Sequence, residues 1–281
     1  MRSLAESHRA SRSDKSGVRG DVPNIEKTPG GLPLSEGGSG ESVATSHPEH
    51  AARPASACAE CRAAFQGSVL RSAATTRRSF PWRRSERSSY ELVVAEILLQ
   101  QTRAEQAAKV FPTLVDQCPD WLGLANMPTP DLEELLRPLG LQKRRAAALQ
   151  ALAQEVLERG LPASASELEA LPGVGQYMAR AIAAQLSNEV VAPIDTNVAR
   201  VLERVFGPRR LADIRHDPDL QALALALVPR SDSGGYLVAL LDFASAICRP
   251  RTPRCDECPA PACRYRWENM NSCHKSETGS S

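Results

Sequence analysis

The chain has 281 residues, and its 34 Lys and Arg residues against 33 Asp and Glu residues give a formal net charge of +1. This balance excludes a strong positive field over the whole molecule, so a nucleic-acid-binding surface would have to be local. No apolar stretch approaches the roughly 20 residues of a membrane span, and no apolar signal-peptide core follows Met1. We therefore expect an intracellular protein without a membrane partner. A monomer is also expected.

The two ends of the chain are rich in Ser, Gly, Pro and charged residues and contain few large apolar side chains. Such segments cannot bury enough surface to offset the entropy of ordering them. We therefore expect disordered tails at 1–75 and 268–281. Cys58 and Cys61 form an isolated Cys-x2-Cys pair in the first tail, where half of a zinc site is one interpretation and a non-functional pair is the favoured one.

Order is expected to begin near 80–83, FPWR, and to continue through about 190 residues of short helices. Ser88 or Ser89 can cap the first helix. Its apolar residues fall at i, i+3, i+4, i+7 and i+8, and they are Tyr90, Val93, Val94, Ile97 and Leu98. Further helices are predicted at 103–117, 130–137, 142–159, 176–186, 195–206, 217–228 and 234–247, and Ser164 with Glu167 forms a capping box. Since no convincing strand pair is found, the fold class is predicted to be all-α.

Residues 171–175 read LPGVG and lead directly into the helix predicted at 176–186. Gly173 and Gly175 allow backbone conformations and close approaches that a Cβ atom would block. The free N–H groups and the positive dipole end of the following helix suit an anion. The stretch therefore predicts a helix–turn–helix that binds a phosphate, and a plain helix connector is the alternative.

Asp195 stands about 20 residues further on, in IDTNVARVL at 194–202, where it can cap the next helix. An aspartate at this position is usually structural, but here it follows a phosphate-binding turn. The LPGVG turn, the downstream aspartate and a terminal cysteine cluster, in that order, resemble the helix-hairpin-helix (HhH-GPD) glycosylase superfamily. That superfamily includes endonuclease III and the MutY adenine glycosylases, and the resemblance covers about 78–267.

The resemblance implies a two-lobed helical fold, with a six-helix barrel lobe and an iron–sulfur cluster lobe. It implies a glycosylase domain at 78–247, a hairpin at 168–183 and a cluster loop at 248–267. The implied partner is double-stranded DNA that contains a mismatched or damaged base. By the same resemblance, the hairpin residues expected to contact DNA are Leu171, Gly173, Val174 and Gly175.

Four cysteines near the C-terminus, Cys248, Cys255, Cys258 and Cys263, are spaced C-x6-C-x2-C-x4-C. Four thiolates this close suit one compact metal centre, whereas zinc usually takes two Cys-x2-Cys pairs set well apart. The resemblance implies a [4Fe–4S] cluster, although the family's usual last spacing is x5. A zinc ion or four free cysteines would also be compatible with the sequence. The surrounding loop is basic, which offers phosphate contacts.

Breaking a base–sugar bond creates positive charge on the sugar and negative charge on the departing base. A carboxylate near the sugar stabilises the first, and a general acid assists the second. By resemblance, Asp195 stabilises the oxocarbenium-like sugar. Glu96, in AEILLQQT, matches the glutamate that MutY-type enzymes use to protonate adenine. A solvated helix position is the alternative for Glu96, but its helical neighbours are apolar, and a semi-buried carboxyl can have a raised pKa.

Tyr177 occupies the position at which bifunctional members of the superfamily carry a lysine. That lysine forms a Schiff base with the sugar and then cleaves the strand, which a tyrosine cannot do. We therefore predict an enzyme that removes a base and leaves the backbone intact. A packing role for Tyr177 is compatible with the same prediction.

A base inside a duplex is out of reach, so the target nucleotide must flip out and the gap must be filled. Gln100 and Gln101 match the QQ pair of MutY-type sequences, and one of them is expected to enter the duplex. Glutamines on a helix surface are the alternative. The basic run at 143–145, KRR, is predicted to be a solvated face that also touches phosphates.

The substrate base is left open between two branches of the superfamily. Glu96 and the QQT that follows favour adenine opposite G or 8-oxoguanine. Adenine is opposed by the short stretch after Cys263, since MutY enzymes usually carry a further C-terminal domain, and by GLQKRRA at 140–146, where they carry a GYY segment. That segment, LDFASAIC at 241–248 and Tyr177 are closer to the branch that removes thymine or uracil opposite G. Two further functions stay open at this point. One is a bifunctional glycosylase/lyase that uses another nucleophile, such as Lys143, and the second is a non-catalytic iron–sulfur DNA-binding protein.

Overall fold

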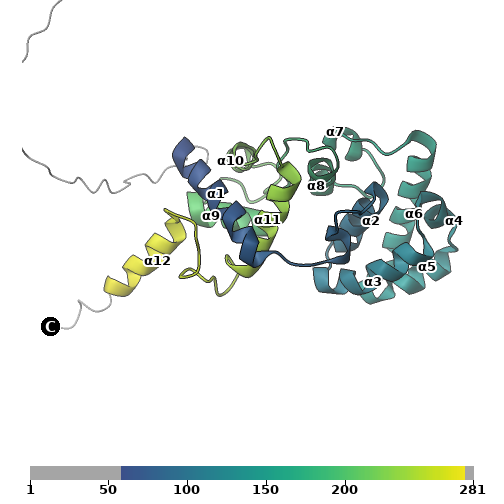
Figure 1. Ribbon diagram of the computed structural model, residues 1–281, viewed down its shortest axis with the longest axis horizontal. Coiled ribbons are helices and arrows are strands. Elements are labelled where there is room, and N and C mark those ends of the chain that lie inside the picture. The colour runs from purple at the N-terminus through teal and green to yellow at the C-terminus, as the bar shows by residue number, and fades with distance from the viewer. Residues whose placement is uncertain (1–57, 276–281) are drawn as a thin grey trace, which may run out of the picture. The chain divides into compact units, whose positions relative to one another are not determined.

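A computed structural model describes residues 58–275, and side chains are described for 58–269. Within 58–275 every regular element is a helix (Figure 1), which confirms the all-α prediction. None of the helices in that range is both long and apolar enough to span a bilayer. Residues 1–57 and 276–281, which hold most of the predicted tails, lie outside the described part of the chain.

The α-helices are α1 (Ala59–Thr76), α2 (Ser89–Leu99), α3 (Ala104–Gln117), α4 (Trp121–Asn126), α5 (Thr129–Leu136), α6 (Gln142–Arg159), α7 (Ala165–Leu168), α8 (Gln176–Leu186), α9 (Thr196–Phe206), α10 (Pro218–Ala226), α11 (Ser233–Ala246) and α12 (Arg264–Lys275). Two short 3₁₀ helices, η2 (Pro81–Arg83) and η3 (Arg137–Leu139), lie between them. The helices predicted from 88 to 247 all form within a few residues of their expected bounds. The short α4 was not predicted.

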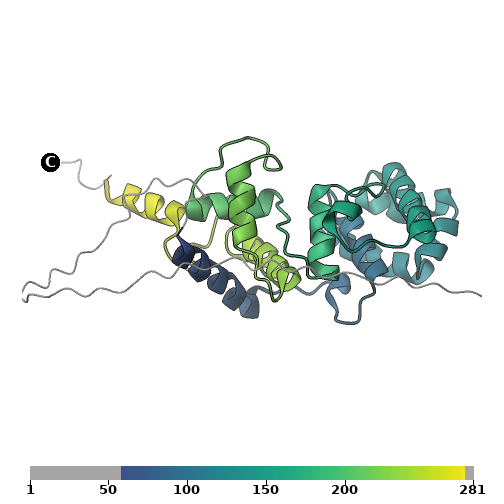
Figure 2. The same cartoon turned by 90° about the horizontal axis from the view of Figure 1, so that it is seen from above.

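The helices enclose two separate hydrophobic cores, which confirms the two-lobed fold. The first lobe is built from α2 to α8 around residues such as Leu98, Leu149 and Ile182. The second, here called the cysteine lobe, combines α1 with α9, α10, α11 and the cysteine loop around residues such as Phe65 and Phe243. Figure 2 shows the teal helices of the first lobe gathered apart from the blue α1 and the green helices of the second.

The lobes meet where α11 passes α8. A Cβ on Gly234 would lie 2.9 Å from the carbonyl oxygen of Ala184. The neighbouring Ser233 hydroxyl donates a hydrogen bond to that same oxygen at 3.1 Å. Only glycine fits at such an approach, so this contact fixes how closely the two helices pack.

The prediction of a disordered tail is wrong for the part of 1–75 that forms α1. Its buried residues Phe65 and Val69 are four apart and pack into the cysteine lobe. Ser68 donates a hydrogen bond to the carbonyl of Pro259, at 3.0 Å, within the cysteine loop. One face of a helix is enough to bury these few apolar residues, although the composition of the segment is polar. The predicted tail at 268–281 is likewise wrong up to Lys275, where α12 ends.

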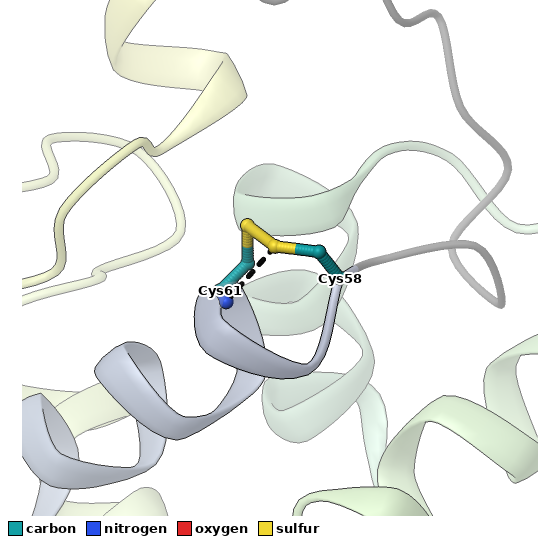
Figure 3. The surroundings of a disulfide bond; sticks show 2 residues. All are labelled: Cys58 and Cys61. Atoms are coloured by element: carbon teal, nitrogen blue, oxygen red, sulfur yellow. Dashed lines mark hydrogen bonds between the residues drawn. A yellow bond between two sulfur atoms is a disulfide. The ribbon is translucent and has the colours of Figure 1, made fainter. Parts of the chain in front are cut away.

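Cys58 and Cys61 form a disulfide at the start of α1, as Figure 3 shows. Cys58 is the N-cap, and its sulfur accepts a hydrogen bond from the Cys61 N–H at 3.1 Å. The two cysteines of the pair are therefore bonded to each other in this structure. Because the two residues are only 3 apart in sequence, the bridge closes a very short loop and restricts the unfolded chain less than a bridge between distant residues would.

Candidate active site

The three residues predicted to be catalytic line one cleft, which has a volume of about 1070 Å³ and draws its walls from both lobes. Glu96 comes from α2, Tyr177 from the first turn of α8, and Asp195 from the residue before α9. Gln100, Gln101 and Gly175 line the same cleft. Residues that lie up to 99 positions apart in the sequence are thus brought to one site.

Glu96 is half-buried, and its Oε1 accepts a hydrogen bond from Gln185 Nε2 at 3.1 Å. Arg87 donates to the amide oxygen of the same Gln185 at 3.4 Å, which orients the amide. Burial raises the pKa of Glu96 to about 7, although the Gln185 hydrogen bond and the charges of Arg83 and Arg87 act in the opposite direction. Both protonation states of Glu96 are therefore accessible near neutral pH.

Tyr177 lies close enough to Glu96 and Asp195 for their charges to affect its pKa. Burial raises its pKa well above the usual value, and the charges of Glu96 and Asp195 add to the increase. Its phenol therefore stays protonated at neutral pH and offers a hydroxyl to the cleft, but no amine.

Asp195 is the N-cap of α9 and is held by three hydrogen bonds. Its Oδ1 accepts from the backbone N–H groups of Asn197 at 2.9 Å and Val198 at 2.7 Å. Its Oδ2 accepts from the side-chain amide of Asn197 at 2.7 Å. The local sequence explains this arrangement, since an aspartate before a helix satisfies the first free N–H groups.

A chain of hydrogen bonds joins Asp195 to the cysteine loop. Arg200 donates to the side-chain oxygen of Asn197 at 2.9 Å and to the carbonyl of Cys248 at 3.0 Å. Arg204, one turn further along α9, lies 3.5 Å from the Cys248 sulfur and donates to the Arg249 carbonyl at 2.6 Å. The position of the carboxylate is thus coupled to the shape of the loop.

The four clustered cysteines are unbridged, and Cys248 is buried. Burial raises the pKa values of the Cys258 and Cys263 thiols, and the charges of neighbouring cysteines raise them further. Within the described residues, no three Cys, His, Asp or Glu side chains converge to hold a single metal ion. A cubane iron–sulfur cluster takes each thiolate at a different corner, whereas tetrahedral zinc draws four ligands to one ion.

The hairpin places its predicted DNA-binding residues in two different environments. Leu171 and Val174 are buried, and their N–H groups already donate to carbonyls of Leu168 and Leu171. Gly173 and Gly175 are exposed, and their N–H groups have no partner among the described residues. Only the glycine N–H groups and the first turn of α8 are therefore free to bind a phosphate, while Leu171 and Val174 serve the core.

Gly173 has a φ of +76°, and a Cβ there would lie 3.0 Å from the Cβ of Ala148 on α6. A larger residue at this position would be strained in its backbone and would also collide with α6. The close approach means that packing against α6 fixes the position of the hairpin backbone at Gly173.

The two predicted wedge residues differ in their surroundings. Gln100 donates from Nε2 to the Gly173 carbonyl at 2.9 Å, so its side chain is tied to the hairpin. Gln101 is exposed, has a left-handed φ of 52°, and its side chain makes no hydrogen bond within the described residues. Gln101 is thus the one whose side chain is available to enter a duplex.

Leu141 and Arg145 have surroundings that the sequence did not predict. Leu141 has a left-handed φ of 54° and is 51% exposed, and the warning sign was a leucine at a helix start, where polar caps are usual. Arg145 is only 4% exposed, so the prediction of a solvated face at 143–145 is wrong at this residue. Its guanidinium turns inward because unsatisfied carbonyls at the end of α2 lie next to α6.

A further cation, Arg83, lies at the cleft wall. Its Nη1 donates to Oδ2 of the buried Asp242 at 2.7 Å and to the carbonyl of Arg78 at 3.1 Å. Its charge lowers the pKa values of both Glu96 and Tyr177, against the effect of burial. Arg83 therefore lies at the cleft wall as one half of an ion pair with Asp242.

Comparison with known proteins identifies the architecture. The family described as "HhH-GPD superfamily base excision DNA repair protein" matches residues 94–219. The thymine-DNA glycosylase of Aeropyrum pernix is 32% identical over 188 residues, which cover 65% of this chain and 84% of that protein. The adenine DNA glycosylase of Mycobacterium tuberculosis is 35% identical over 193 residues, which cover 67% of this chain and 63% of that protein.

Among solved structures, a thermostable thymine-DNA glycosylase has a TM-score of 0.70 at 29% identity and covers 74% of this chain and 98% of its own. A non-covalent endonuclease III–DNA complex shares the fold, with a TM-score of 0.65 at 21% identity, and covers 76% of this chain and 99% of its own. The all-helical fold, the hairpin around Gly173 and these relatives all indicate the same family. The chain belongs to the HhH-GPD superfamily of base excision DNA repair proteins.

Proposed function

We propose that this protein is a monofunctional DNA N-glycosylase that acts as a monomer, flips a mispaired base out of duplex DNA and hydrolyses its bond to the sugar. The observation that carries the proposal is the convergence of Glu96, Tyr177 and Asp195 in one cleft beside a hairpin with free N–H groups. Two acidic groups with different environments can divide the charge stabilisation and proton transfer that this reaction needs.

Asp195 is assigned to the sugar. Its three hydrogen bonds hold the carboxylate in a fixed position, so it is ready to stabilise positive charge without reorganising. The same carboxylate can orient the attacking water. Tyr177 supplies a hydroxyl and no amine, so the sugar forms no Schiff base and the strand stays intact.

Glu96 is assigned to the departing base. With a pKa of about 7 it can hold a proton at neutral pH and deliver it, or it can accept a hydrogen bond from the base when ionised. Gln185 orients the carboxyl group for either task.

The base that is removed is proposed to be thymine or uracil opposite guanine. A pyrimidine leaves with negative charge, and relatives named thymine-DNA glycosylase and thymine/uracil-DNA glycosylase favour this branch. Adenine opposite guanine or 8-oxoguanine is the second candidate, because adenine needs the general acid that Glu96 can provide. Relatives named for each of these two activities are similar to this chain.

Cys248, Cys255, Cys258 and Cys263 are proposed to hold a [4Fe–4S] cluster. When bound, the cluster would fix the shape of the loop and leave the bond-breaking to the protein. The loop would then present Arg249, Arg251 and Arg254 to the phosphate backbone.

The test is a base-release assay on labelled duplexes with T, U or A opposite G, and A opposite 8-oxoguanine, each with and without alkali. Release of one base, with strand breakage only after alkali, is expected. Breakage without alkali would show a bifunctional enzyme instead. Binding of the duplexes without any base release would show a non-catalytic DNA-binding protein.

A further inference from the structure

Two surface loops near the cleft hold non-glycine residues in the left-handed region. They are the loop after α2, with Gln101 at φ 52°, and the turn before α6, with Leu141 at φ 54°. Both residues are exposed. This conformation is uncommon for residues other than glycine, and it persists only where the surroundings impose it. Something buried beneath the two loops must therefore hold them.

Arg145 on α6 is that buried group. Its Nη1 donates to the carbonyls of Ile97 at 2.7 Å and Leu98 at 3.3 Å, at the last turn of α2. Its Nη2 donates to the carbonyl of Gln100 and to the hydroxyl of Thr102, on either side of Gln101. Its Nε donates to the carbonyl of Gly140, the residue before Leu141, at 3.1 Å. One side chain thus bonds both loops.

No carboxylate of the described residues forms an ion pair with Arg145. Its charge faces the negative end of the α2 dipole and carbonyl oxygens instead. All five donors of the guanidinium act in a fixed plane, which lysine, with its compact ammonium, cannot reproduce. The position therefore requires arginine for geometry rather than for charge alone.

The same helix also supports the hairpin, since Ala148 of α6 packs against Gly173, to whose carbonyl Gln100 donates. We propose that Arg145 is a positioning residue that holds the Gln101 loop and the Leu141 turn as one rigid unit, and so fixes where Gln101 stands when the target base leaves the duplex. This inference rests on the proposed function. It assigns Arg145 to base flipping and not to breakage of the base–sugar bond.

The test compares Arg145→Met and Arg145→Lys with the wild-type protein, and Arg159→Met is the matched control. Arg159 is exposed at the far end of α6 and pairs with Glu155, so its loss removes the same charge outside the cleft. The substrate is the duplex that the wild-type protein processes, with 2-aminopurine next to the target base. The fluorescence of 2-aminopurine reports unstacking, and single-turnover rates at several pH values report the chemistry.

Arg145→Met is expected to lower the single-turnover rate by at least about tenfold, as misplacement of a positioned group does. The 2-aminopurine signal should fall with it, while the shape of the pH profile stays that of the wild type because Glu96 and Asp195 are untouched. Arg145→Lys should fold and show the same loss to a smaller degree, which keeps the test valid if Arg145→Met does not fold. Arg159→Met should match the wild type.

A wild-type fluorescence signal in Arg145→Met and Arg145→Lys, or an unchanged rate, would overturn the inference while the proposed function stands. A changed pH profile would also overturn it, since Arg145 would then act on the chemistry. Failure of the wild-type protein to release any base would instead overturn the proposed function on which the inference rests.

Discussion

Gln185 Nε2 donates a hydrogen bond to Glu96 Oε1 across 3.1 Å and thereby joins α8 to α2 at the floor of the cleft. The two residues are 89 positions apart. The hydrogen bond holds one oxygen of the Glu96 carboxyl group. Because burial raises the pKa of Glu96 to about 7, this group is close to half-protonated at neutral pH. The pair therefore sets both the direction and the protonation of the group assigned to the departing base.

The pH dependence of base release is expected to reveal which form of Glu96 is active. If Glu96 is the general acid, the single-turnover rate falls by about tenfold per pH unit above about pH 7. If the ionised form is needed, the rate instead rises through the same range. Glu96→Gln should abolish this limb of the profile, whereas Glu158→Gln, at an exposed position of α6, should preserve it. A profile of Glu96→Gln identical to that of the wild type would contradict the assignment.

The free energy of unfolding should also depend on pH through the titration of Glu96. Because the folded-state pKa of Glu96 is raised from 4.5 to about 7, the folded state binds more protons than the unfolded state between these values. The contribution of this group is full below pH 4.5 and is lost as the pH rises through about 7. The free energy of unfolding of Glu96→Gln, measured by denaturant titration, should depend less on pH over this window. Equal slopes in both proteins would show that Glu96 is not buried in solution.

Replacement of Asp195 by asparagine is expected to lower base release by about 100-fold or more, since it removes a preorganised charge from the transition state. The thermal midpoint should change little, because asparagine also caps helices. Asp232→Asn, the equivalent change at the N-cap of α11, lies outside the cleft and should leave the rate unchanged. Full activity in Asp195→Asn would assign the aspartate to capping alone.

Tyr177→Lys should convert the enzyme into one that cuts the strand. An amine at this position would lie beside Glu96 and Asp195 and could form an imine with the sugar. The measurement is strand breakage without alkali, together with covalent trapping of the protein on DNA by borohydride. The wild-type protein should show neither. Breakage by the wild type, trapped through another residue, would refute the monofunctional assignment.

Arg200→Gln should lower the rate of base release by about tenfold, because it breaks the hydrogen-bond chain that joins Cys248 to Asn197 and Asp195. Iron content and helical signal should remain close to those of the wild type. Arg180→Gln is the control, since Arg180 is also half-buried and donates to a carbonyl, that of Ala192, outside the cleft. An equal loss of rate in both variants would point to general destabilisation.

Reduction of the Cys58–Cys61 disulfide should affect stability little. In the chain-entropy relation, a loop this short contributes about 2 kcal/mol at most, and the helix turn already holds the two residues near each other. Thermal melting of Cys58→Ser/Cys61→Ser should therefore resemble that of the wild type, with unchanged base release. A large drop in the melting midpoint would show that the bridge supports α1 and, through Ser68, the cysteine loop.

Much of the molecule could be predicted from the sequence because it depends on interactions within a few residues. The helices of the first lobe, the cap made by Ser88, the turn at Gly173 and the cap made by Asp195 all form from neighbours in the chain. The spacing of the four cysteines is likewise a local property. These features were predicted within a few residues of their observed positions.

Other features were decided only by the tertiary structure, since they depend on what packs against each residue. The polar segment at 59–76 becomes a helix because the cysteine lobe covers Phe65 and Val69. Arg145 sits in a run of basic residues that composition assigns to the surface, yet it is buried because the end of α2 presents carbonyls to it. Burial and contact between distant segments are set by the whole fold, and a single sequence read locally does not contain them.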